Sequence, residues 1–165
     1  IEAYNLFMDL TQTDYDLVLV SANEFPAEIH NSIQQSPYKH KIKCLHNIID
    51  RELPRIYNAA SIFAFTSDYE GFGNPLLEAM ACGLPVVAVN NSSVPEVVGD
   101  AGLLVSKDPE EIAKALALLH TDQSLHNSLR EKGLKRAQQF TWALSAVQTR
   151  RCFKSLFDGS APDDF

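Results

Sequence analysis

Three short runs that are apolar throughout constrain the fold of this chain more than any other feature. They occupy residues 17–20 (LVLV), 62–65 (IFAF) and 85–89 (PVVAV). A strand with one face in solvent alternates apolar and polar residues, whereas a strand covered by helices on both faces is apolar along its length. The runs therefore predict buried strands of a parallel sheet. Residues 42–45 and 103–105 are weaker candidates of the same kind.

Segments with helical spacing separate these runs. They cover residues 24–35, 51–59, 74–82 and 109–120. The alternation of strands and helices is typical of a doubly wound α/β domain built on a parallel sheet. After Asp108 only helical patterns follow, and Thr141 is expected to cap a last helix that ends near residue 157.

The length and the start of the chain bear on its domain organisation. A chain of 165 residues with 45% hydrophobic content can bury one core but hardly two. We expect one domain over residues 1–157 and a solvated tail over residues 158–165. Residues 1–10 have helical spacing with no strand before them, although a parallel β-α unit opens with a strand. We therefore expect the first strand and a further domain upstream of Ile1.

Composition argues against several classes of function. The formal charge of −7 argues against a nucleic-acid partner, whose phosphates attract basic faces. The odd number and wide spacing of Cys44, Cys82 and Cys152 predict reduced core thiols rather than disulfides or a metal site. The sequence shows no apolar run of about 20 residues and no signal-peptide pattern, so we expect a soluble, cytoplasmic protein.

The strongest candidate for a ligand site is the segment TSDYEGFGNP at residues 66–75. It follows a predicted strand and opens a predicted helix, which is where doubly wound sheets bind ligands. Gly71 and Gly73 permit a tight turn and a close approach of the backbone to a ligand. Asn74 is expected as the helix N-cap and Pro75 as the first helical residue. The amides at this helix start can hold a diphosphate.

Two further features bear on what this helix start binds. Glu78 lies in the first helical turn and can accept hydrogen bonds from the vicinal hydroxyls of a ribose. No Lys or Arg occurs between Arg55 and Lys107, so a phosphate here relies on backbone amides or on cations from elsewhere. The same pattern is also typical of a plain turn followed by a glutamate that favours the helix dipole. The residue pattern alone leaves both interpretations open.

The stretch EGFGNPLLEAMACGLPVVA, residues 70–88, resembles the E-x7-E signature of glycosyltransferase family 4, a family with the GT-B fold. The flanking segments that also resemble this family are residues 43–48, 52–60, 94–105 and 140–142. His46 departs from the family pattern, which commonly has Gly there, and this leaves the shape of the base pocket open. The resemblance implies the Rossmann-like C-terminal half of a GT-B enzyme.

The resemblance also implies roles for individual residues. Glu70 takes the catalytic position that contacts the donor sugar near the reacting carbon, and Glu78 takes the ribose-binding position. The amides that would contact sugar hydroxyls and phosphate are those of Gly71, Phe72, Gly73 and Asn74. The implied reaction transfers a sugar from a UDP- or GDP-sugar to a carbohydrate or lipid-linked acceptor, as in polysaccharide biosynthesis. The anomeric configuration is retained, and no metal or other cofactor is required.

Part of the family's machinery has no counterpart in this sequence. The family uses an Arg/Lys pair at the end of the first strand of this half, and a functional His in the N-terminal half. The resemblance therefore implies that this chain is inactive alone and that its partner is the N-terminal domain of the same enzyme. Two other interpretations stay open: another GT-B enzyme, such as a sugar-nucleotide epimerase, and a non-catalytic nucleotide-sugar-binding domain.

A few other residues are given structural interpretations. Tyr57 and Trp142 are expected to pack in the core. The basic end of the last helix favours the helix dipole and is only a weak signal for a membrane surface; it consists of Arg150, Arg151 and Lys154. The histidines expected at the surface are His30, His40, His120 and His126.

Overall fold

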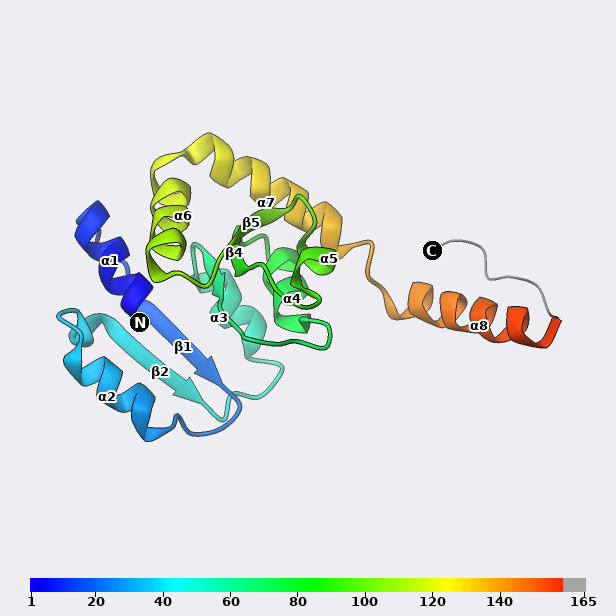
Figure 1. Ribbon diagram of the computed structural model, residues 1–165, viewed down its shortest axis with the longest axis horizontal. Helices are drawn as coiled ribbons and strands as arrows, with labels where there is room; N and C mark the ends of the chain where they lie inside the picture. Colours follow the sequence, from blue (N-terminus) through cyan, green and yellow to red (C-terminus); the bar gives the residue numbers. More distant parts are fainter. Residues whose placement is uncertain (159–165) are drawn as a thin grey trace.

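The computed structural model describes residues 1–158, in which helices and strands alternate as far as residue 121 (Figure 1). The strands are β1 (Leu17–Ser21), β2 (Ile42–His46), β3 (Phe63–Phe65), β4 (Val86–Val89) and β5 (Gly102–Val105). The helices before the third strand are α1 (Glu2–Thr11), α2 (Ala27–Gln35), the 3₁₀ turn η1 (Lys39–Lys41) and α3 (Leu53–Ala59). The later helices are α4 (Asn74–Ala81), α5 (Val94–Val98), α6 (Pro109–Thr121), α7 (Gln123–Ala137) and α8 (Trp142–Asp158).

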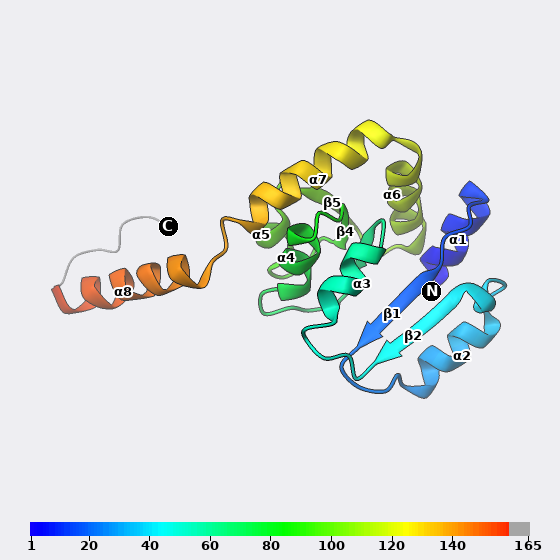
Figure 2. The ribbon, with the colours of Figure 1, turned by 180° about the vertical axis from the view of Figure 1, so that it is seen from behind.

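All strand pairs of the described chain are parallel, and they form two sheets. One sheet has the order β1-β2, and the other has the order β3-β4-β5. In Figures 1 and 2, β1 is the strand of its pair that lies nearer to the elements of the three-stranded sheet. The predicted α/β architecture with parallel strands and covering helices is confirmed. The strands of the described chain form two separate parallel sheets rather than one.

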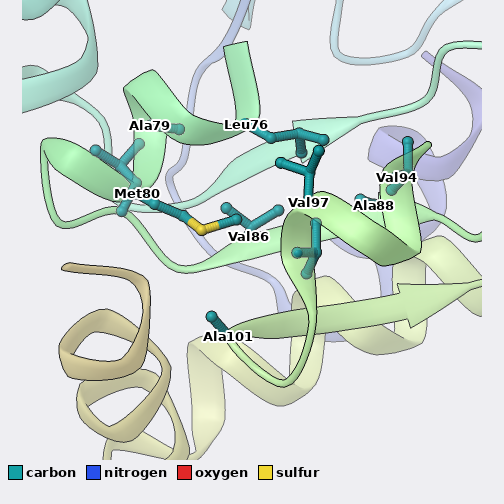
Figure 3. Packing of buried hydrophobic residues seen from close by; sticks show 10 residues of the cluster. Leu76, Ala79, Met80, Val86, Ala88, Val94, Val97 and Ala101 are labelled. Atoms are coloured by element: carbon teal, nitrogen blue, oxygen red, sulfur yellow. The ribbon is translucent and has the colours of Figure 1, made fainter. Parts of the chain in front are cut away.

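The main core lies between α4, β4 and α5 (Figure 3). All four residues of β4 are buried, as the continuously apolar run predicted. The side chains of Met80 from α4 and Val97 from α5 lie on either side of the Val86 side chain, within one cluster. The buried residues of α4, Leu76, Ala79 and Met80, therefore fix this helix against β4 and α5. This packing sets the direction of the N-terminus of α4.

A second cluster joins the start of the chain to its middle. Tyr4, Phe7 and Met8 of α1 are buried together with Ala113 of α6. The hydroxyl of Tyr4 donates a 2.7 Å hydrogen bond to the carbonyl of Tyr15, just before β1. The predicted helix at residues 1–10 is therefore confirmed and is part of the packed domain.

Burial of β1 differs from the prediction. Val18 and Val20 are 41% and 43% exposed, while Leu17, Leu19 and Ser21 are half-buried. An apolar run is therefore not covered on both faces here, because no helix of residues 1–158 packs over the Val18 and Val20 face. The run at residues 62–65 is also not buried throughout, because Ala64 of β3 is exposed. Two predicted helices also begin late: α2 starts after Pro26, whose backbone is extended, and α3 starts at Leu53.

The end of the described chain stands apart from the domain. In both views α8 extends away from the other elements (Figures 1 and 2). The hydroxyl of Thr141 accepts a hydrogen bond from the amide of Leu144 at 3.1 Å, so the predicted cap is confirmed. The prediction that Trp142 packs in the core is wrong: its side chain is 90% exposed, because it lies on this projecting helix. The tail predicted over residues 158–165 lies, from residue 159, outside the described residues.

Other predicted features have mixed outcomes. Two histidines expected at the surface are half-buried. His120 packs edge-on against Tyr15 with 5.4 Å between ring centroids, and an imidazole nitrogen of His126 lies 3.2 Å from the Ser61 carbonyl oxygen. The three cysteines are free and half-buried rather than core residues. Among residues 1–158, none of the helices is both long and apolar enough to cross a membrane.

Candidate functional site

The candidate site is the turn between β3 and α4. Gly73 is the N-cap residue of α4. It has φ 102°, a conformation that residues with a side chain rarely adopt. The prediction that Asn74 is the N-cap is wrong, because Gly73 holds that position and no side chain caps the helix. Pro75 consequently occupies the second helical position rather than the first. Proline has no backbone N–H, but no helical hydrogen bond is lost at this position, because the first-turn amides of a helix have no acceptor within the helix.

Four consecutive amides of this turn have no acceptor in the described chain. They belong to Gly71, Phe72, Gly73 and Asn74, and no oxygen of residues 1–158 accepts a hydrogen bond from them. The first amide of α4 that is bonded is that of Leu76, which donates to the Gly73 carbonyl at 3.0 Å. Together with the positive end of the helix dipole, these amides form a cradle that can accept an anion or sugar hydroxyls.

The two glutamates of the pattern lie at either end of this cradle. Glu70 lies in the turn directly before Gly71 and is half-buried, while Glu78 lies on α4 and is exposed. Glu78 Oε2 accepts a 2.9 Å hydrogen bond from the hydroxyl of Tyr57 on α3. Burial, followed by this hydrogen bond, raises the pKa of Tyr57 above its ordinary value. The phenol therefore stays protonated as a donor, which favours one orientation of the Glu78 carboxylate.

The interpretation of Tyr57 as a packing residue covers only its ring. That ring packs edge-on against Phe63 of β3, with 5.6 Å between centroids and 72° between planes. The hydroxyl of Tyr57 has a separate role, because it donates a hydrogen bond to the Glu78 carboxylate. Sequence reasoning missed this contact because the two residues are 21 positions apart. The only available signal was that a tyrosine, rather than a phenylalanine, occupies a helix facing the site.

The turn is also held from the loop between β4 and α5, a contribution that sequence reasoning did not identify. The side-chain amide of Asn91 donates to the carbonyls of Ser67 and Asp68 at 2.8 and 3.2 Å. The hydroxyl of Ser93 lies within hydrogen-bond distance of two further turn carbonyls, and the hydroxyl oxygen of Ser92 accepts from the amide of Glu70 at 3.1 Å. All five contacts join residues more than 20 positions apart, so no local pattern indicates them.

An aromatic contact anchors the middle of the turn. The ring of Phe72 packs against that of Phe140 with 5.8 Å between centroids and 69° between planes. The guanidinium of Arg136 lies 4.8 Å from the centroid of the Phe140 ring. The same guanidinium donates to the carbonyls of Glu96 and Val97 at the end of α5. Phe72 is thereby tied to the segment between α7 and α8, although its own side chain remains 42% exposed.

The charge around the turn agrees with the gap in basic residues seen in the sequence. Lys107 follows β5 and forms an ion pair with Asp68 at the start of the turn. Arg136 is occupied by carbonyl oxygens at the end of α5. In residues 1–158, binding of an anion at the cradle therefore rests on main-chain amides and on the helix dipole. Such a site can bind a diphosphate and stabilise charge that develops on it.

Comparison with known proteins gives consistent matches. The model of the family described as glycosyl transferases group 1 matches residues 1–136. The O-antigen chain mannosyltransferase B of Escherichia coli is 39% identical over 162 residues, which cover 94% of this chain and 42% of that protein. The chain thus spans less than half the length of this relative.

Two solved structures illustrate the similarity in fold. Anabaena HepE in complex with UDP and glucose superposes with a TM-score of 0.78 at 25% identity, over 92% of this chain and 44% of that one. The C-terminal domain of a glycosyl transferase group 1 family protein, LpcC, from Francisella tularensis superposes with a TM-score of 0.69 at 27% identity. That superposition covers 84% of this chain and 77% of the LpcC domain.

Proposed function

This chain belongs to the glycosyl transferases group 1 family, and from that premise we propose that it is the C-terminal, donor-binding domain of a retaining glycosyltransferase of family 4. The observation that carries the proposal is the row of four amides without acceptors at the start of α4, flanked by Glu70 and Glu78. The first amides of any helix lack an acceptor within the helix and are satisfied by side chains, water or a ligand. Their place after a strand of a parallel α/β domain, where such domains bind ligands, favours a ligand here.

The donor is proposed to be a UDP- or GDP-sugar. The similarity to HepE, whose structure contains UDP and glucose, supports a nucleotide sugar, and the similarity to a mannosyltransferase supports a hexose. Glu78 would accept hydrogen bonds from the ribose hydroxyls, with Tyr57 holding its carboxylate. Glu70 would contact the donor sugar near its anomeric carbon. No metal is part of the proposal.

The amide cradle would act on the leaving group. When the bond between the anomeric carbon and the diphosphate oxygen breaks, the oxygen of the acceptor hydroxyl bonds to the same carbon and negative charge grows on the diphosphate. The departing diphosphate takes up the proton that the acceptor hydroxyl loses. Amides that already point at this position need no reorganisation, which is the source of their catalytic value. The acceptor is proposed to be a carbohydrate or a lipid-linked carbohydrate, as the name of the O-antigen relative suggests.

The rest of the machinery is proposed to lie in other parts of the full-length protein. One edge of β1 and one edge of β3 have no strand partner in residues 1–158. A further parallel strand between them would complete one sheet, and it would carry the basic pair that this chain lacks. We expect this chain alone to bind nucleotide but not to transfer sugar.

The test is isothermal titration of the full-length protein with UDP and with GDP. Glu78→Ala is expected to weaken binding of the preferred nucleotide by roughly 1.5–3 kcal/mol, the scale of a charged hydrogen bond. That range corresponds to about 10- to 150-fold in Kd. Glu131→Ala, at an exposed glutamate of α7, is the matched control and should bind like the wild type. Equal affinity of the Glu78 variant and the control would refute the ribose assignment.

A further inference from the structure

Ser93 occupies the N-cap position of α5 but does not cap it. Serine is among the preferred N-cap residues because its hydroxyl oxygen ordinarily accepts from an amide of its own helix. Here no side chain caps α5. The hydroxyl of Ser93 instead points across to the β3–α4 turn, where it lies 2.9 Å from the Phe72 carbonyl oxygen and 3.1 Å from that of Glu70. A residue suited to local capping is thus used for a long-range contact.

The one hydroxyl proton of Ser93 is shared between these two carbonyl oxygens, and this shared contact orients both peptide groups. In a trans peptide the C=O and the following N–H lie in one plane and point in opposite directions, and the described residues contain no cis peptide. A Glu70 carbonyl directed at Ser93 therefore aims the Gly71 amide away from it. In the same way, a Phe72 carbonyl directed at Ser93 aims the Gly73 amide away. Both amides belong to the cradle and have no acceptor in residues 1–158.

Asn91 and Ser92 hold the start of the same turn. Asn91 donates to the carbonyls of Ser67 and Asp68, and the Ser92 hydroxyl oxygen accepts from the Glu70 amide. Ser92 itself has a φ of 41°, which is uncommon outside glycine and places its hydroxyl at the turn. Three consecutive side chains of the β4–α5 loop thus contact four carbonyls and one amide of the β3–α4 turn.

We propose that Ser93, supported by Asn91 and Ser92, is a positioning residue that aims the Gly71 and Gly73 amides at the diphosphate and sugar of the donor. The proposal rests on the proposed function for the identity of the ligand. Ser93 does not itself touch the ligand; it acts through the peptide groups whose carbonyls it holds. Its removal should therefore affect recognition of the parts of the donor that face the amides, and not of the nucleoside.

The test compares Ser93→Ala with Ser93→Thr in the full-length protein. The threonine variant keeps the hydroxyl and serves as the conservative control. Each protein is titrated with UDP-glucose and UMP, and with GDP-mannose and GMP. Affinity of Ser93→Ala for the preferred nucleotide sugar should fall about 10-fold, since two amides lose their fixed aim, while affinity for the monophosphate changes less than about 2-fold. Ser93→Thr should retain most of the nucleotide-sugar affinity.

A crystal structure of each variant supplies a readout that needs no ligand. In Ser93→Ala the carbonyls of Glu70 and Phe72 are expected to turn away from residue 93, or the turn is expected to become mobile, whereas Ser93→Thr keeps the wild-type turn. An unchanged turn in Ser93→Ala overturns the proposal. An equal loss of affinity for nucleotide sugar and monophosphate also overturns it, because a merely structural defect would act in that way. If the wild type binds no nucleotide sugar, the proposed function fails, and the crystal structures still decide whether Ser93 aims the amides.

Discussion

Replacement of Gly73 by alanine provides a sharp test of the geometry of the turn. The backbone of Gly73 has φ 102°, which a residue with a Cβ atom adopts only with strain. A Cβ built at this position would lie 2.9 Å from Cδ1 of Leu76, closer than carbon atoms tolerate. Leu76 cannot move aside easily, because its side chain is fully buried in the main core.

The two effects can be added to give a magnitude. Holding a residue other than glycine in a sparsely populated backbone conformation costs about 1–3 kcal/mol. Forcing an additional methyl group into a packed core costs a further 1–3 kcal/mol. Gly73→Ala is therefore expected to lower the free energy of unfolding by about 2–6 kcal/mol, a large part of the roughly 5–15 kcal/mol that folded proteins typically possess.

The neighbouring glycine is the matched control. A Cβ at Gly71 would meet no atom within 4 Å, and the residue is not in a left-handed conformation. Gly71→Ala should change the free energy of unfolding by less than about 0.5 kcal/mol, as surface substitutions usually do. The assay is urea denaturation of the full-length protein and both variants, followed by circular dichroism. Equal stability of the two variants would refute the reasoning, since it attributes the difference to φ and to Leu76 alone.

Two further predictions concern tyrosines. Tyr57→Phe keeps the ring but loses the 2.9 Å bond to Glu78, so nucleotide affinity in calorimetric titration should fall about 2- to 10-fold; affinity equal to wild type would contradict a positioning role. Burial, and then the charge of Asp16, raises the pKa of Tyr4 to about 12 from 10.0, so folding stability should decline as pH rises from 10 toward 12. The sign follows because the folded state holds this proton more tightly than the unfolded chain. Tyr4→Phe should flatten that decline in alkaline unfolding curves, and an unchanged slope would contradict the assignment.

Much of the fold follows from patterns that are local in the sequence. The apolar runs located all five strands of the described chain, although only β4 is buried along its whole length. Capping residues marked helix starts in places, as with Thr141, whose hydroxyl oxygen accepts a hydrogen bond from the Leu144 amide at 3.1 Å. Local patterns did not always predict which side chains are buried, because burial depends on elements that are distant in the sequence. Val18 and Trp142 are examples, since both were expected to be buried and both are exposed.

The sequence by itself determined the candidate site: a strand, a turn with two glycines that begins with Glu70, and a helix start that carries Glu78, all within residues 62–78. Only the tertiary structure decided how that turn is held. Gly73 rather than Asn74 holds the N-cap position of the helix, with a positive φ and no side-chain cap. The contacts of Tyr57 with Glu78 and of Ser93 with the turn join residues 21 to 23 positions apart. Packing of α3 and α5 around the core creates these contacts, and no short-range pattern of residues encodes them.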